Sequence, residues 1–244
     1  MNITTELVKQ LMKEQFPQWK ELEIRPVAKS GHDNRTFHLG DTMAVRLLSG
    51  RDYAAQSAKE MQWLPYLQEH LNYPISKPVA AGTPTDYYPF PWSVNLWLEG
   101  NTLLEEDSLD KEQFAQDLSG ALKKLQSIDC SKGPRGGLHN FYRGCDLKIY
   151  HKETVNAICQ LSDILPASQL TKIWDRCISS IYQDHAVWVH GDIAPGNILL
   201  QNHHFYGLID FGVMGTGDPA CDYAMAWTYF DKQSRKILLE ETQN

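Results

Sequence analysis

The stretch VWVHGDIAPGNILL, residues 187–200, constrains this chain more than any other part of its sequence. Two apolar, β-prone runs flank a short polar loop that contains Asp192 and Asn197, and the Pro-Gly pair between these residues favours a tight turn. A second apolar run, FYGLIDFG, leads to Asp210. We expect both runs to be buried strands that pair with each other, which would place Asp210 beside Asn197.

Three polar side chains at strand ends indicate a specific chemistry when they meet. An Asn oxygen and an Asp carboxylate form a hard-oxygen site that suits Mg²⁺, which commonly takes one or two protein ligands together with phosphate oxygens. Asp192 could orient a hydroxyl group and accept its proton. The alternative is that all three are ordinary polar turn residues, and their combined spacing argues against it.

The order H-x-D-x-x-x-x-N followed by D-F-G resembles the catalytic core of the protein-kinase-like fold. The HGD form and the later segment GDPACDYA, residues 217–224, are similar to the aminoglycoside phosphotransferase family and its small-molecule kinase relatives. The match runs in order from about Lys29 to Trp227. It implies an α+β, two-lobed fold with a small N-terminal antiparallel sheet lobe and a larger, mainly helical C-terminal lobe. The expected lobes are residues 1–100, which bind nucleotide and include the hinge, and residues 101–244, which carry the catalytic groups.

The resemblance also implies roles for the motif residues. Asp192 would be the catalytic base or hydroxyl-orienting residue, and Asn197 and Asp210 would hold Mg²⁺. His190 would brace the catalytic loop from within.

Local patterns are compatible with this architecture. The expected helices cover the N-terminus after a Thr4 or Thr5 cap, residues 51–70 with a kink or break at Pro65, 110–128, 146–163, 167–183, and a last helix from about residue 222. The strand-like pieces ELEIRPVA, NRTFHLG and TMAVRLL predict an antiparallel meander, and WSVNLWLEG predicts a linking strand. Asp218 and Asp222 are expected to cap and anchor the last helix.

The resemblance places the nucleotide in the N-terminal lobe. Arg46 stands where the family usually has a phosphate-binding Lys, and Arg can bind phosphate with a different geometry. Glu60 would be its partner, although a surface Glu on an amphipathic helix is an equal alternative. The phosphate-covering loop would be SGHDNRTF, whose amides and Ser30, Asn34 and Arg35 side chains could cap phosphates, and an ordinary hairpin turn is the alternative.

The segment VNLWLEG would be the hinge. Adenine would bond to main-chain groups near Leu96 and Leu98. ATP is the expected nucleotide, with GTP left open because backbone groups do the binding.

Composition limits the classes of binding partner and the cellular compartment that we expect for this chain. A net charge of −7 without a long basic run argues against nucleic acid as a partner. Five widely spaced cysteines without a CxxC pair favour reduced thiols in the cytoplasm. The N-terminus lacks the pattern of a signal peptide, and no stretch approaches the ~18 apolar residues of a membrane span.

Three functions remain open at this point. The favoured one is an ATP- and Mg²⁺-dependent phosphotransferase that acts on a hydroxyl of a small molecule, preferably aminoglycoside-like, and so modifies an antibiotic. A metabolite kinase for choline, homoserine or a sugar-like acceptor is a second possibility. The chain ends 34 residues after Asp210 (244 − 210), whereas similar family members continue with helices that build the acceptor pocket. An inactive, pseudokinase-like nucleotide-binding module is therefore the third.

Overall fold

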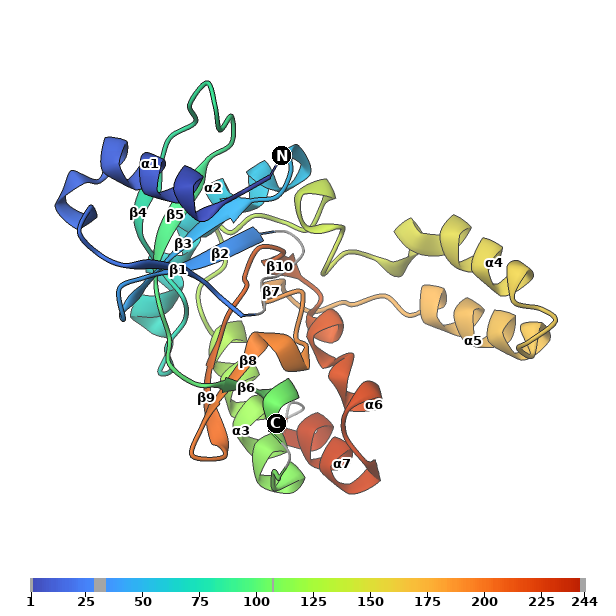
Figure 1. Cartoon of the computed structure of the whole chain (residues 1–244). Coiled ribbons are helices and arrows are strands. Elements are labelled where there is room, and N and C mark those ends of the chain that lie inside the picture. Colours follow the sequence, from blue (N-terminus) through green and yellow to red (C-terminus); the bar gives the residue numbers. More distant parts are fainter. Residues whose placement is uncertain (1, 29–33, 107, 242–244) are drawn as a thin grey trace.

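The structure is a computed structural model that describes residues 2–28, 34–106 and 108–241, apart from the side chains of Asp52 and Glu241. It has the two-lobed, protein-kinase-like α+β fold that the sequence predicts (Figure 1). The N-terminal lobe contains an antiparallel sheet with the strand order β1-β2-β3-β5-β4. Its strands are β1 (Ile24–Pro26), β2 (Asn34–Leu39), β3 (Met43–Leu48), β4 (Pro78–Gly82) and β5 (Trp92–Leu96).

The predicted meander of the first three strands is confirmed, because β1 pairs with β2 and β2 with β3, both antiparallel. Strand β4 was not predicted, because prolines punctuate its surroundings. It lies at the edge of the sheet, where Pro78 costs little because an edge strand has a side without ladder hydrogen bonds.

Two helices belong to the first part of the chain. Helix α1 (Thr5–Gln15) begins as expected, since the Thr4 side chain accepts a hydrogen bond from the N–H of Leu7. Helix α2 (Ala54–His70) runs through Pro65 without ending, so a break at Pro65 is wrong, whereas a kink there stays a prediction. Burial of Leu64 and Leu67 in the core beneath this half of the helix stabilises it beyond the proline.

The second part of the chain is mainly helical. Its helices are α3 (Lys111–Gln126), α4 (His151–Gln160), α5 (Ala167–Ser179), α6 (Met225–Thr228) and α7 (Lys232–Glu241). Its strands are β6 (Asn101–Thr102), β7 (Val187–Val189), β8 (Ile198–Gln201), β9 (His204–Leu208) and β10 (Gly215–Gly217). We keep Gly100 as the proposed boundary between the lobes, because β6 already pairs with β8.

Two hydrophobic cores hold the elements in place. One joins α1 to the N-terminal sheet. The other gathers α3, α7, the C-terminal half of α2 and the strands around the catalytic loop. Helix α2 therefore contacts both the sheet lobe and the helical lobe, and it couples their positions.

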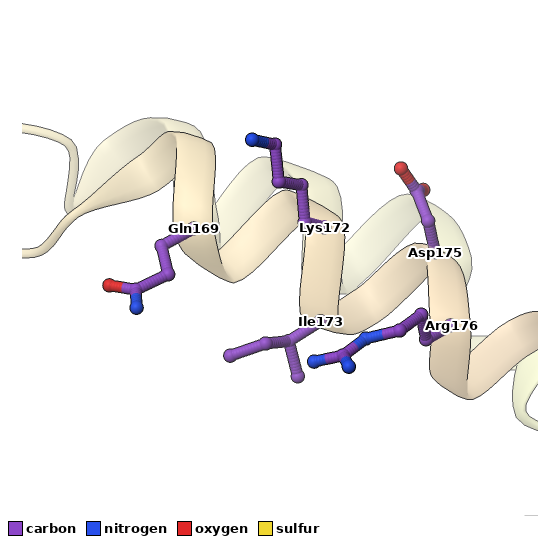
Figure 2. A pocket seen from close by; sticks show the side chains of 5 residues that line it. All are labelled: Gln169, Lys172, Ile173, Asp175 and Arg176. Carbon is purple, nitrogen blue, oxygen red and sulfur yellow. The ribbon is translucent and has the colours of Figure 1, made fainter.

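Helices α4 and α5 form a pair that projects to one side of the body (Figure 1). Neither helix has a buried residue. A hollow of about 500 Å³ on α5 is lined by Gln169, Lys172, Ile173, Asp175 and Arg176. Figure 2 shows Gln169, Ile173 and Arg176 on one side of this helix and Lys172 and Asp175 on the other. Since one helix supplies all five, no groups from different elements converge there.

Two differences from the predicted elements concern the site. Strand β9 ends at Leu208 rather than Asp210, because Asp210 has a φ of 64°, in the left-handed region where a strand cannot continue. The single last helix predicted from residue 222 is instead a short 3₁₀ turn, Pro219–Tyr223, followed by α6 and α7.

Candidate active site

The loop after β7 is held by two fully buried partners. The side chain of His190 accepts the N–H of Asp192 at Nδ1 (3.2 Å), so its proton lies on Nε2, which donates to the carbonyl of Ile209 (3.0 Å). A neutral histidine thus connects the loop to the residue that precedes Asp210. This contact agrees with the bracing position that the resemblance implied for His190.

The carboxylate of Asp222 fixes the same loop from the other side. Its Oδ2 accepts the N–H of His190 at 2.8 Å and its Oδ1 accepts the N–H of Gly191 at 2.7 Å. Burial raises the pKa of Asp222, and these backbone hydrogen bonds oppose the shift. The expectation that Asp222 anchors the following helix is therefore wrong. Asp218 alone caps that segment, through the N–H of Ala220.

Asp192 and Asn197 contact each other within the loop. The Asn197 side-chain nitrogen donates to the Asp192 carbonyl and to its Oδ2, both at 2.9 Å. Because the nitrogen makes these two bonds, the amide oxygen of Asn197 is the atom that could bind a cation. Asp192 itself is exposed, so a substrate hydroxyl could reach its carboxylate.

The end of β9 brings Asp210 to the same place. The N–H of Ile209 donates to the carbonyl of Asn197 at 3.0 Å, and Asp210 follows directly. A left-handed φ in a residue other than glycine is a strained geometry that often occurs at functional sites. The structure therefore brings Asp192, Asn197 and Asp210 together, as the sequence predicted.

Arg46 lies between two carboxylates. Its guanidinium contacts Glu60 at 3.0 Å and Oδ1 of Asp210 at 3.1 Å, with the side chains of Arg46 and Glu60 only 11% and 9% exposed. Burial opposes the charge of Arg46, but the two carboxylates outweigh it and raise the pKa of the guanidinium. Of the two alternatives for Glu60, the structure shows the buried partner of Arg46 rather than a surface residue.

A cleft of about 540 Å³ connects these groups to the N-terminal sheet. Its lining combines residues of β2, of β3 and of the segment after β5 with the two candidate cation ligands. Its lining includes Asn34, Thr36, His38, Ala44, Arg46, Ser76, Trp97, Leu98, Asn197 and Asp210. Ser30, predicted to cap phosphates, lies outside the described residues.

The expected hinge residues differ in their surroundings. The N–H of Leu96 donates to the carbonyl of Lys77 (2.9 Å), and its carbonyl accepts from the Ser76 hydroxyl (3.0 Å). Leu98 lines the cleft, so its main chain is the better placed of the two for a base. Base binding by either residue stays a prediction.

Sequence reasoning missed two aromatic residues of the cleft. Trp97 and His38 both line the cleft, and their ring centroids lie 4.1 Å apart. The alternation of Asn34, Thr36 and His38 with the buried Phe37 and Leu39 could have indicated the open face of β2.

The oxygen donors of Asn197 and Asp210 fit a hard cation whose coordination is completed by phosphate oxygens. Oδ1 of Asp210 is bonded to Arg46, so Oδ2 and the Asn197 amide oxygen remain as ligands. Within the described ranges, no three His, Cys, Asp or Glu side chains converge on a metal site. A cation here would therefore depend on the nucleotide for further ligands, which is the usual case for Mg²⁺.

Among the helices of the described residues, none has the length and apolar character that crossing a membrane requires.

Known structures share this fold. The GDP and kanamycin complex of APH(2")-IIia is 18% identical, with a TM-score of 0.76 over 97% of this chain and 82% of that chain. Macrolide 2'-phosphotransferase MphH from Brachybacterium faecium is 17% identical, with a TM-score of 0.71 over 96% of this chain and 82% of that chain. At these identities, the likeness establishes the fold.

Sequence comparison goes further. The uncharacterized protein YcbJ of Bacillus subtilis (strain 168) is 25% identical over 186 residues, which is 73% of this chain and 55% of that protein. The chain thus spans about half the length of the curated relative it matches. A family model described as Phosphotransferase enzyme family matches residues 23–244, nearly the whole chain. On this match, and with a fold and a cleft that agree with it, the chain belongs to the phosphotransferase enzyme family.

Proposed function

We propose that the chain transfers the γ-phosphate of ATP to a hydroxyl group of a small molecule. The observation that carries this proposal is the continuous polar set Glu60–Arg46–Asp210, which meets the Asp192–Asn197 pair through the bond between Ile209 and Asn197. Three members of this set, Arg46, Asn197 and Asp210, line a cleft of about 540 Å³, which is large enough for a nucleotide. Phosphoryl transfer requires positioning and charge stabilisation of this kind.

Each residue has a defined task in this proposal. Asp192 orients the acceptor hydroxyl and accepts its proton as the new P–O bond forms. Asn197 and Asp210 would hold Mg²⁺, which neutralises charge on the β- and γ-phosphates. Arg46 supplies positive charge beside the phosphates, and Glu60 fixes its direction. His190 and Asp222 contact no substrate and hold the loop that carries Asp192.

An aminoglycoside-like acceptor is the favoured substrate class. The similar structures include one described as holding kanamycin and another as the streptomycin-ATP-APH(2")-IIa ternary complex. The net charge of −7 is compatible with a cationic acceptor. A macrolide, or a metabolite such as choline, homoserine or a sugar, would use the same hydroxyl chemistry.

ATP as the nucleotide and five free cysteines support a cytoplasmic site of action.

One observation favours a second candidate, an inactive nucleotide-binding module. The contact between Arg46 and Oδ1 of Asp210 occupies one oxygen of a proposed cation ligand. A cation would then have to bind through Oδ2 or displace the arginine. Turnover with any acceptor would exclude this candidate.

The test is Mg²⁺-dependent release of ADP from ATP with a panel of aminoglycosides, macrolides and small amino-alcohols. Asp192→Asn is the matched variant, because an amide can still accept the Asn197 hydrogen bond but cannot take a proton. We expect one acceptor class to stimulate release and the variant to lose roughly 10²–10⁴-fold of that turnover. Full activity of Asp192→Asn would refute the assigned mechanism, and nucleotide binding without turnover by the wild type would favour the inactive module.

A further inference from the structure

A second buried cation, Lys59, lies next to Glu60 on α2. Lys59 is only 7% exposed. Its Nζ donates to the carbonyl of Met214 at 2.8 Å and contacts Nδ1 of His139 at 3.1 Å. Within the part of the chain that the structure describes, no carboxylate lies within 4.0 Å of this Nζ. Burial lowers the pKa of Lys59 to about 8, although the nearby charge of Glu60 opposes the shift.

Burying an amine without a contacting carboxylate is unfavourable for folding, so stability alone does not explain a lysine here. Packing would be satisfied by an unbranched apolar side chain of similar length. The reason for a lysine at this position must therefore lie in the two segments that its amine contacts.

One of these segments connects the candidate cation ligand to the catalytic loop. Met214 lies four residues after Asp210 and closes a turn through its N–H, which donates to the carbonyl of Phe211 at 2.9 Å. The next residue, Gly215, begins β10 and pairs with Val189, directly before His190. Lys59 thus binds the turn that runs from Asp210 to the strand beside His190.

The second segment is the 3₁₀ turn Leu138–Asn140, which follows α3. The Nε2 of His139 donates to the carbonyl of Arg135 at 2.8 Å, which leaves Nδ1 unprotonated to accept from Lys59. The amine of Lys59 is therefore shared between two parts of the C-terminal lobe, while its own helix also carries the partner of Arg46.

A neighbouring residue of α2 reaches the same turn. A Cβ atom placed on Gly212 would lie 2.8 Å from Oε1 of Gln56. Gln56, Lys59 and Glu60 follow the i, i+3, i+4 spacing of one helix face. That face lies against Gly212 and Met214, both of which follow Asp210 in the chain.

We propose that Lys59 is a positioning residue that holds the turn after Asp210 against α2, so that Asp210 meets Arg46 and Glu60 in the arrangement that binds Mg²⁺-nucleotide. The inference rests on the role proposed above for Asp210. Its specific consequence is that loss of the Lys59 amine loosens residues 211–214 without unfolding the chain. The requirement for Mg²⁺ should rise, because Asp210 is then held less firmly.

The experiment compares Lys59→Met with Gln62→Met, a matched change at an exposed position of the same helix. Hydrogen exchange of the backbone amides of residues 211–214 is measured on each full-length protein, with thermal melting as the check on folding. We expect exchange in this segment to accelerate at least ~10-fold in Lys59→Met and to stay at the wild-type rate in Gln62→Met. Melting at or above the wild-type temperature is expected for Lys59→Met at pH 7, because the variant buries no charge.

Turnover supplies the second readout. The Mg²⁺ concentration for half-maximal ADP release should rise several-fold in Lys59→Met, with kcat lowered and the KM for acceptor unchanged. Unchanged exchange in residues 211–214 would overturn the inference whether or not the wild type turns over. A large drop in melting temperature would also overturn it, since Lys59 would then be needed for stability. Failure of the proposed function is recognised separately, by an inactive wild type.

Discussion

The carboxylate of Asp222 accepts the N–H groups of both His190 and Gly191, at 2.8 and 2.7 Å, from a fully buried position. A side chain 31 residues further along the chain than Gly191 thus sets the direction in which the catalytic loop leaves β7. The loop is short, and both of its anchors, His190 and Asp222, are buried.

Asp222→Asn should both destabilise the fold and reduce turnover. The side-chain N–H₂ group of the new Asn would face the N–H of either His190 or Gly191. One charge-assisted hydrogen bond is then lost, and a buried donor is left unpaired. We expect the free energy of unfolding to fall by about 2–3 kcal/mol, measured by urea unfolding. Asp218→Asn is the control, because Asn caps a helical turn as well as Asp does, and it should change stability little.

Gly191 should not tolerate a side chain. Its φ is 84°, and a Cβ atom would lie 2.5 Å from the carbonyl oxygen of Val213. Gly191→Ala should lose about 2 kcal/mol or more of stability together with activity. Gly120 lies at an exposed position in the middle of α3, with open space around a new methyl group. Gly120→Ala should therefore raise the free energy of unfolding by about 0.5–1 kcal/mol. Equal effects of the two substitutions on the unfolding midpoint would contradict this account of the loop.

Arg46 and Glu60 should be energetically coupled. Arg46→Met leaves the buried Glu60 carboxylate without its partner and should cost roughly 3 kcal/mol. The double variant Arg46→Met/Glu60→Met removes that unpaired charge, so it should cost less than the sum of the two single changes by about 0.5–3 kcal/mol. A double-mutant cycle in urea measures this difference, and strict additivity would show that the contact contributes nothing.

Stability should depend on pH through Lys59. Its pKa is about 8 in the folded protein, below its ordinary value of 10.5, so between these values the unfolded chain binds more protons. The contribution of Lys59 to the free energy of unfolding must therefore be most unfavourable below pH 8 and must improve as the pH rises from 8 to 10.5. The difference in stability between Lys59→Met and wild type, measured from pH 7 to 10, should shrink over this window. A constant difference would mean that Lys59 titrates normally.

Much of the site follows from local sequence. The five-residue spacing of Asp192 and Asn197 fits a single tight turn, and two apolar runs that pair as β8 and β9 bring Asp210 to it. The helical spacing of Phe114, Leu118, Leu122 and Leu125 predicts α3, and all four are buried. These features depend on neighbours in the chain or on adjacent strands, which a pattern can reveal.

The remaining features depend on distant contacts. Lys59 belongs to a helix whose charged residues suggest a solvated face, and only the fold brings Met214 and His139 to it. Asp222 resembles a helix cap, because its two N–H partners lie more than 30 residues earlier. Trp97 lines the cleft because its ring packs against that of His38, which lies on β2 and is distant in the sequence.

The most direct test of the central claim is identification of the product. Wild type and Asp192→Asn would be incubated with Mg²⁺, ATP and the acceptor that best stimulates ADP release, and the acceptor analysed by mass spectrometry. The account predicts that wild type adds one phosphoryl group to an acceptor hydroxyl and that Asp192→Asn forms this product roughly 10²–10⁴-fold more slowly. Equal product formation by both proteins would contradict the assignment of Asp192 as the group that accepts the hydroxyl proton.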